Sequence, residues 1–276
     1  RLDTIIERLK QQSLGLQKQR DDLLEAAGLL EIYRDDGHVC KRCEDTGYIG
    51  STKCECFQKL LREAAFDALG ASHPQDCRFS HFSLDYYSPQ PLANGVVPRQ
   101  RMAQVKNFCS DYARDFFVER HSFSKAQSSP SLLFLGNTGL GKTHLSLAIA
   151  GQVINKGYGV IYGSAQNLLA KLEKEKFSFN NTEDQPQSYL SLVLECDLLI
   201  LDDLGTEFLS QFVTAMLYNI INTRLLEGRP TIISTNLSFQ EISKRYTDRL
   251  TSRLFGGYMH FEFLGRDIRI QSKIMG

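Results

Sequence analysis

The sequence carries no net charge, because 32 basic side chains balance 32 acidic ones. That balance excludes a uniformly basic nucleic-acid-binding protein, although it leaves room for a local basic patch. No apolar run approaches the roughly 18 residues that a membrane-spanning helix needs, and the first residues lack the pattern of an export signal. We therefore expect a cytoplasmic protein without a membrane partner, with its seven cysteines reduced. Because the first residue is Arg1 and not methionine, we also expect native sequence upstream.

One motif near the middle of the chain joins an apolar run to a helical pattern. Residues 132–135 form a predicted buried strand, and residues 144–153 a predicted helix. Between them lies a GxxxxGKT loop, whose backbone N–H groups bind phosphates, whose lysine reaches the β- and γ-phosphates and whose threonine binds Mg²⁺. A glycine turn without a ligand would explain single glycines but not the whole motif. The sequence therefore predicts an ATP or GTP site at Gly136, Asn137, Thr138, Gly139, Leu140, Gly141, Lys142 and Thr143.

Two later strands end in polar residues. Residues 198–201 are apolar and run into Asp202 and Asp203, and residues 231–235 run into Asn236. In an α/β protein such strand ends meet at the edge where the ligand binds. Asp202 would hold Mg²⁺ through water, Asp203 would act as general base with Glu207 as a second candidate, and Asn236 would position the attacking water. Solvated turns are the alternative for both segments.

Arginines follow these strands. Arg249 and Arg253 are spaced to share one helix face. That face could present a guanidinium to the γ-phosphate of a neighbouring subunit, or it could be an ordinary salt-bridged surface. Arg269 could close over the nucleotide within its own subunit. Three lysines could contact DNA phosphates, although a solvated helix face is the alternative; they are Lys171, Lys174 and Lys176.

Four cysteines fall in two close pairs near the start of the chain. Cys40 and Cys43 form C-x2-C, and Cys54 and Cys56 form C-x-C after ten intervening residues. Four thiolates in two pairs predict a structural Zn²⁺ site. His38 could replace one ligand, and unligated thiols or a redox C-x2-C are the alternatives.

Ahead of the pairs, leucines recur every seven residues and predict one or two amphipathic helices that need a partner surface; they are Leu2, Leu9, Leu16, Leu23 and Leu30.

Helical and strand patterns alternate from about Met102, beginning with a helix predicted over residues 102–119. This alternation predicts an α/β fold in which helices cover both faces of a parallel sheet. We expect a helical, zinc-binding domain over residues 1–75, a linker or lead-in over residues 76–98, and a nucleotide-hydrolysing domain over residues 99–276.

The order of these motifs resembles the AAA+ ATPases of the replicative helicase loader family, the DnaC/DnaI type. The segments that carry the resemblance are the P-loop, LLILDDLGTE, ISTN, RLTSRL and FLGRDIR, and the cysteine pairs resemble the zinc-binding N-terminal domain of DnaI-like loaders. The resemblance covers about residues 20–270. It implies a P-loop NTPase that uses ATP and Mg²⁺ as a switch, binds a hexameric DnaB-type helicase and helps to place it on single-stranded DNA.

The resemblance also implies residue roles. Asn236 matches sensor 1, Arg269 the sensor-2 arginine, and Arg253 an arginine finger, which would require self-association. Asp203 stands where many AAA+ proteins have glutamate, which implies slow turnover. The core is also similar to IstB-type transposition ATPases, which act with a transposase and generally lack the cysteine pairs. A non-catalytic nucleotide-binding adaptor is the third alternative.

Overall fold

The computed structural model describes residues 15–16, 18–28, 38–50, 52–68, 77–119, 128–177 and 188–275. The chain divides into two compact units, Arg1–Leu60 and Leu61–Gly276, which we treat separately. This division comes earlier than the predicted boundary at residue 75. Within the described residues, no helix combines the length and the apolar character needed to cross a bilayer.

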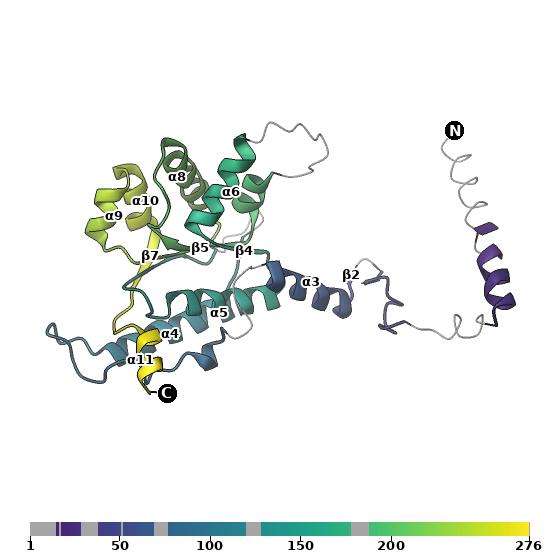
Figure 1. Ribbon diagram of the computed structural model, residues 1–276, viewed down its shortest axis with the longest axis horizontal. Coiled ribbons are helices and arrows are strands. Elements are labelled where there is room, and N and C mark those ends of the chain that lie inside the picture. The colour runs from purple at the N-terminus through teal and green to yellow at the C-terminus, as the bar shows by residue number, and fades with distance from the viewer. Residues whose placement is uncertain are drawn as a thin grey trace. The chain divides into compact units, whose positions relative to one another are not determined.

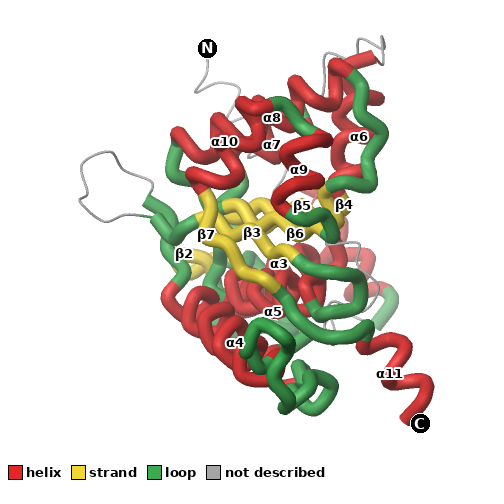
Figure 2. The backbone as a smooth tube through the Cα atoms, turned by 90° about the vertical axis from the view of Figure 1, so that its left-hand side faces the viewer, coloured by secondary structure: helices red, strands yellow, loops and turns green. Residues whose placement is uncertain are grey.

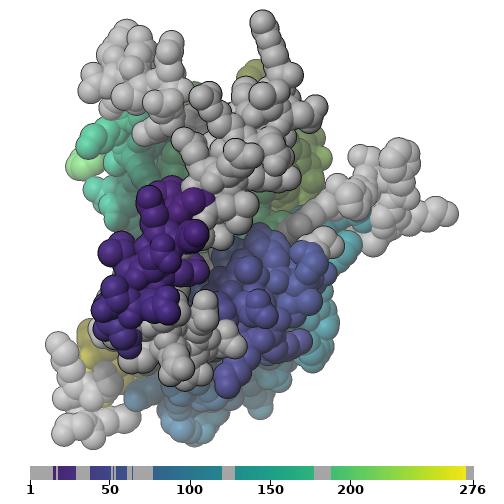
Figure 3. All heavy atoms as spheres, turned by 90° about the vertical axis from the view of Figure 1, so that its right-hand side faces the viewer, coloured from purple at the N-terminus to yellow at the C-terminus, as the bar shows by residue number. Residues whose placement is uncertain are grey.

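The smaller unit contains part of the first predicted helix and a short hairpin. Residues 18–26 are helical, and Leu16 and Leu23 expose 67% and 72% of their surface; residues 15–28 are purple in Figure 3. Leu2, Leu9 and Leu30 lie outside the described residues, so the amphipathic helix and its partner surface stay a prediction. Strands β1 (Tyr48–Ile49) and β2 (Thr52–Lys53) pair antiparallel, and α3 (Glu55–Ala68) follows them.

The larger unit is built on a five-stranded sheet in the order β4-β5-β6-β3-β7, in which every neighbouring pair is parallel. The strands are β3 (Ser131–Leu135), β4 (Val160–Ser164), β5 (Leu198–Leu204), β6 (Thr231–Thr235) and β7 (Tyr258–Glu262). The structure confirms the three strands predicted above, which are β3, β5 and β6. The sequence did not reveal β7, since this edge strand is only partly buried and lacks an apolar run.

Helices cover both faces of the sheet, as predicted (Figures 1 and 2). One face packs against α4 (Pro98–Asp115) and α5 (Lys142–Asn155). The other packs against α6 (Ala165–Phe177), α7 (Tyr189–Glu195), α8 (Gln211–Leu226), α9 (Phe239–Arg245) and α10 (Asp248–Gly257). Alternation along β5 supplies both cores, because Ile200 faces α5 while Leu199 and Leu201 face the other layer. The last helix is α11 (Ile268–Met275).

The described residues 77–97, which precede α4, lie within the larger unit and lead into it. Phe82 and Tyr87 are 5% and 1% exposed and lie in the same core as α5. A short 3-10 turn, η2 (Phe79–His81), precedes them. Helix α4 starts and ends earlier than predicted, because Pro98 stands in its first turn and Phe116 leaves the helix for the core.

Candidate functional site: a nucleotide site and a cysteine cluster

The predicted P-loop connects β3 to α5, which is the context that the motif requires. Its glycines at 136, 139 and 141 have φ angles of 143°, 72° and 85°, a region that side chains disfavour. A Cβ at Gly136 would lie 2.5 Å from the carbonyl oxygen of Phe263, and one at Gly141 would lie 2.6 Å from the Phe82 ring. The loop can therefore keep this shape only with glycine at these positions.

Lys142 points its ammonium group back into the loop. Its Nζ donates to the carbonyl oxygens of Gly136 and Asn137 at 2.7 and 2.8 Å and to Oδ1 of Asn236 at 2.7 Å. The side chain is 5% exposed, and this burial lowers the pKa of Lys142 to about 8. A nearby anion stabilises a buried ammonium, so the loop favours an anionic ligand.

Asp202 ends the apolar part of β5 and accepts hydrogen bonds from three hydroxyl groups. Its Oδ2 receives Thr143 Oγ1 and the Tyr162 hydroxyl, both at 2.9 Å, and its Oδ1 receives Ser234 Oγ. Asp202 is only 4% exposed. A carboxylate beside a threonine hydroxyl is a set of hard oxygen donors, which fits Mg²⁺. The sequence pointed to Thr143 and Asp202 but not to Tyr162 or Ser234.

Asp203 has a left-handed backbone, with φ of 53°, which is uncommon outside glycine. Its N–H donates to Ser234 Oγ at 2.9 Å, and Asn236 Nδ2 donates to its Oδ1 at 3.4 Å. Burial and the neighbouring Asp202 raise the pKa of Asp203, which suits a group that accepts a proton. The structure thus brings Lys142, Asn236 and Asp203 into one hydrogen-bonded row.

Glu207, the second candidate base, is 3% exposed and bonded to protein groups. One oxygen accepts the Gly205 N–H at 2.9 Å, the other accepts the Tyr246 hydroxyl, and Arg245 lies at 3.5 Å. These contacts connect the loop after β5 to the end of α9. The geometry therefore favours Asp203 over Glu207 as the base.

A cavity of about 250 Å³ opens over the P-loop and reaches Asp203, Asn236 and Arg269. Its other wall comes from His81, Phe82 and Tyr86, in the segment that the sequence left open as a linker or a lead-in. This segment is anchored, because the Tyr87 hydroxyl donates to the Leu140 carbonyl at 2.9 Å. Aromatic rings suit the stacking of a nucleotide base. In the sequence, the cluster of aromatic residues ahead of α4 was the feature that could have indicated this wall of the cavity.

The segment that carries Arg269 is also attached to the P-loop. The Ile268 N–H donates to the Gly139 carbonyl at 3.0 Å, and Asp267 Oδ1 accepts the Arg269 N–H at 2.9 Å. Arg269 thereby lines the cavity within its own subunit. Arg249 and Arg253 are exposed on α10 and do not line this cavity. A phosphate contact from Arg253 would have to be made in a neighbouring subunit.

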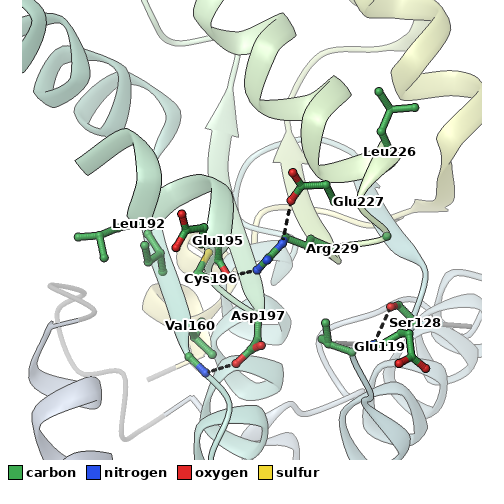
Figure 4. A pocket seen from close by; sticks show the side chains of 14 residues that line it. Glu119, Ser128, Val160, Leu192, Glu195, Cys196, Asp197, Leu226, Glu227 and Arg229 are labelled. Carbon is green, nitrogen blue, oxygen red and sulfur yellow. Dashed lines mark hydrogen bonds and ion pairs between the residues drawn. The ribbon is translucent and has the colours of Figure 1, made fainter. Parts of the chain in front are cut away.

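A larger cavity, of about 1100 Å³, lies at the opposite ends of the strands from the P-loop (Figure 4). Gly159, Asp197 and Arg229 precede β4, β5 and β6, so they mark the amino ends of these strands. Ligands of parallel sheets bind at the carboxyl ends. Arg229 pairs with Glu227 at 2.9 Å, and Asp197 accepts the Gly159 N–H at 2.8 Å. These partners hold the turns between elements, so we assign the nucleotide to the smaller cavity.

The smaller unit brings the four predicted cysteines together, and their Sγ atoms all lie within 4.8 Å of one another. Cys40 and Cys54 are 3.8 Å apart, and Cys43 and Cys56 are 3.3 Å apart. Sulfurs at about 2.3 Å from a tetrahedral zinc ion lie about 3.8 Å apart, so the cluster fits Zn²⁺. Among the described residues this metal-ligand group contains cysteines alone.

Neighbouring groups support the first cysteine pair. Backbone N–H groups of Arg42 and Cys43 lower the pKa of Cys40 to about 7, which favours the thiolate that a metal needs. The Asp45 carboxylate accepts the N–H groups of Val39 and Cys40 at 3.0 and 2.9 Å. Asp45 also lies 3.7 Å from His38 Nδ1, so His38 is placed beside this aspartate.

Two of the three lysines considered for DNA contact lie over aromatic rings. Lys171 Nζ is 3.8 Å from the centre of the Tyr189 ring, and Lys176 Nζ is 4.9 Å from that of Phe212. These contacts connect the middle and the end of α6 to α7 and α8. DNA contact by Lys171, Lys174 or Lys176 stays a prediction.

Comparison with known proteins identifies the core. Residues 107–261 match the family model described as IstB-like ATP binding protein. The chain is 27% identical over 124 residues to the replicative helicase loader DnaC of Escherichia coli strain K12, covering 45% of this chain and 49% of that protein. It is 28% identical over 148 residues to the insertion sequence IS5376 putative ATP-binding protein of Geobacillus stearothermophilus, covering 52% and 57%. The chain thus spans about half the length of these curated relatives.

The solved structures agree on the fold. The crystal structure of the DnaC helicase loader superimposes with a TM-score of 0.52 at 23% identity, covering 70% of this chain and 99% of that one. The larger unit therefore has the AAA+ P-loop fold. Since the family model covers more than half of the sequence and includes the P-loop and strands β4, β5 and β6, the chain belongs to the family of IstB-like ATP-binding proteins.

Proposed function

We propose that this chain is a cytoplasmic ATPase that binds a replicative hexameric helicase of the DnaB type and helps to place it on single-stranded DNA. The observation that carries this proposal is the four-cysteine cluster in the same chain as the ATP-binding core. The core resembles DnaC loaders and insertion-sequence proteins almost equally, at 27% and 28% identity, so it does not separate the two functions. The cysteine cluster favours the loader, because IstB-type transposition ATPases generally lack it.

In the proposed reaction, the P-loop N–H groups and Lys142 bind the phosphates of ATP. Thr143 and Asp202 would hold Mg²⁺, which supplies positive charge against the charge that builds on the phosphates. Asp203, with its raised pKa, takes a proton from the attacking water, and Asn236 orients that water. Arg269 contributes a guanidinium within the subunit. Asp203 is a short base, which fits the slow turnover of a switch.

We propose that Arg253 completes the site in trans. It is exposed on α10 and does not line the cavity of its own subunit. An arginine delivered by a neighbour stabilises transition-state charge only when subunits assemble. Hydrolysis would then depend on self-association promoted by ATP, DNA or the helicase.

The first test is complex formation between the full chain and the replicative helicase of its host. Size exclusion with light scattering, with and without ATP·Mg²⁺, should reveal a stable complex. A double change, Cys54→Ser with Cys56→Ser, should abolish it if the zinc unit recognises the helicase. Cys77→Ser is the matched control, because Cys77 lies outside the cluster and should leave the complex intact.

The transposition function is the second candidate, favoured by the family model and by the IS5376 relative. Absence of a helicase complex, with zinc bound at one equivalent, would contradict the loader proposal. A complex with a transposase from the same host would then establish the alternative. ATP binding without turnover, in the presence of DNA and partner, would identify a nucleotide-binding adaptor.

A further inference from the structure

The carboxylate of Asp202 is held by residues from three different elements. Thr143 at the start of α5 and Tyr162 in β4 both donate to Oδ2 at 2.9 Å, and Ser234 in β6 donates to Oδ1. Thr143 and Asp202 have a proposed role toward Mg²⁺. Tyr162 belongs to none of the motifs that identify the family, and it does not line the cavity over the P-loop.

The register of the sheet explains how Tyr162 reaches this carboxylate. Tyr162 pairs with Ile200, and Ser164 pairs with Asp202, two positions later. Alternate residues of a strand share a face. Tyr162 therefore lies on the same face as Ile200 and Asp202, where its ring packs against the core under α5. The long side chain spans the two positions and delivers its hydroxyl to Oδ2.

We infer that Tyr162 is a positioning residue for the metal. Its hydroxyl fixes the orientation of the Asp202 carboxylate, so that this carboxylate can hold the Mg²⁺ of bound ATP through water. The inference rests on the proposed role of Asp202. Mg²⁺ demands near-ideal octahedral geometry and usually keeps several waters, so a carboxylate that rotates binds those waters poorly. Thr143 and Tyr162 occupy Oδ2 and Ser234 occupies one lone pair of Oδ1, so one lone pair, on Oδ1, is left in a defined direction for a metal water. Tyr162 acts through Asp202 and not on the nucleotide.

A phenylalanine at position 162 separates this role from packing. Tyr162→Phe keeps the ring that packs against the core and removes only the hydroxyl. Partners that orient metal ligands contribute about 10- to 100-fold to metal affinity. We therefore expect Tyr162→Phe to weaken metal binding about tenfold while leaving the affinity for metal-free ATP unchanged.

The experiment measures the metal and the nucleotide separately on the full chain. Mn²⁺ binding at saturating ATP is followed by electron paramagnetic resonance, and fluorescent ATP is titrated in EDTA. Tyr112→Phe is the matched control, because Tyr112 is 7% exposed and its hydroxyl donates to the Pro130 carbonyl at 2.9 Å, outside the site. Asp202→Ala is the reference for loss of the metal-binding carboxylate.

We expect Tyr162→Phe to raise the Mn²⁺ dissociation constant about tenfold, to keep its ATP affinity in EDTA, and to regain hydrolysis at high Mg²⁺. Tyr112→Phe should match the unaltered protein. Unchanged Mn²⁺ binding in Tyr162→Phe, with binding lost in Asp202→Ala, would overturn the inference and leave the proposed site standing. Unchanged binding in Asp202→Ala would overturn the magnesium assignment itself. Loss of ATP binding in EDTA would show that the hydroxyl serves the fold.

Discussion

Arg224 is fully buried and illustrates how single residues carry this fold. Its guanidinium donates to Thr231 Oγ1 at 2.9 Å. It also donates to four main-chain carbonyls, those of Val193, Leu194, Cys196 and Pro230. These contacts join α8 to the end of α7 and to the starts of β5 and β6. If the Arg224 guanidinium is removed, these buried carbonyl oxygens are left without a hydrogen-bond donor.

Arg224→Met should therefore destabilise the larger unit by about 3–5 kcal/mol, since the lost bonds leave buried carbonyls without donors. Urea unfolding, monitored by circular dichroism, measures this change. Arg114→Met is the control, because the Arg114 side chain is 65% exposed and pairs with exposed aspartates. Equal stability of the two variants would contradict the role of Arg224.

Lys142 makes stability depend on pH. Its pKa falls from 10.5 to about 8 on burial, so between these values the unfolded chain binds more protons than the folded one. Stability therefore rises with pH across this window, by about 2 kcal/mol between pH 7.5 and 10. The measurement compares the unaltered protein with Lys142→Met in urea at both pH values. Bound ATP should remove the difference, because its phosphates keep the ammonium charged.

At the scale of elements, the loop between β3 and α5 depends on the segment before α11. A Cβ at Gly139 would lie 1.9 Å from Asp267 Oδ1, whereas one at Gly157 would meet nothing within 4 Å. Both glycines have positive φ, 72° and 88°. The pair therefore separates backbone strain from the contact with Asp267.

Gly139→Ala should push the Asp267 segment off the P-loop and weaken ATP binding more than tenfold. Gly157→Ala should cost about 1 kcal/mol of stability, as a strained backbone does, and leave ATP affinity unchanged. Isothermal titration with ATP and thermal unfolding test both variants. If both glycines behaved alike, the contact between Gly139 and Asp267 would have no role in binding.

Patterns in the sequence predicted those site residues that directly follow an apolar strand. The P-loop, Asp202 and Asn236 follow apolar runs, so strand ends could be read directly from the sequence. Tyr162 and Ser234 could not be found this way, since their contact with Asp202 depends on which strands are neighbours. The aromatic segment at 81–87 was interpreted as part of a linker or lead-in, because the prolines and turn residues around it gave no sign that Phe82 and Tyr87 are buried. Strand β7 was missed because an edge strand needs no apolar run.

At the scale of the whole molecule, the cysteine cluster and the ATP site lie in separate compact units. Removing the proposed zinc should therefore affect partner binding and not ATP binding. Treatment with a colorimetric zinc chelator should release about one zinc per chain, measured from the absorbance of the dye. The same treatment should abolish the proposed helicase complex. ATP affinity should stay within about twofold, because no cysteine of the cluster lines the nucleotide cavity. Parallel loss of ATP binding would show that the units depend on each other.

Assembly makes a second prediction at this scale. Arg253→Ala should bind ATP normally and lose hydrolysis, while Lys142→Ala should lose binding. Mixing the two inactive proteins should restore part of the activity, because Lys142→Ala subunits supply Arg253 to sites that still bind ATP. Phosphate release measures the mixture. Normal hydrolysis by Arg253→Ala alone would show that this arginine is not the trans residue.

Strand β4 is at the edge of the sheet, paired with β5 on one side. Edge strands are the part of a sheet that another chain can reach. Since Tyr162 belongs to this strand, a displacement of β4 moves the hydroxyl that holds Asp202. A chain that bound along β4 and displaced it would therefore move the hydroxyl donor of Asp202, because β4 and β5 are neighbouring strands.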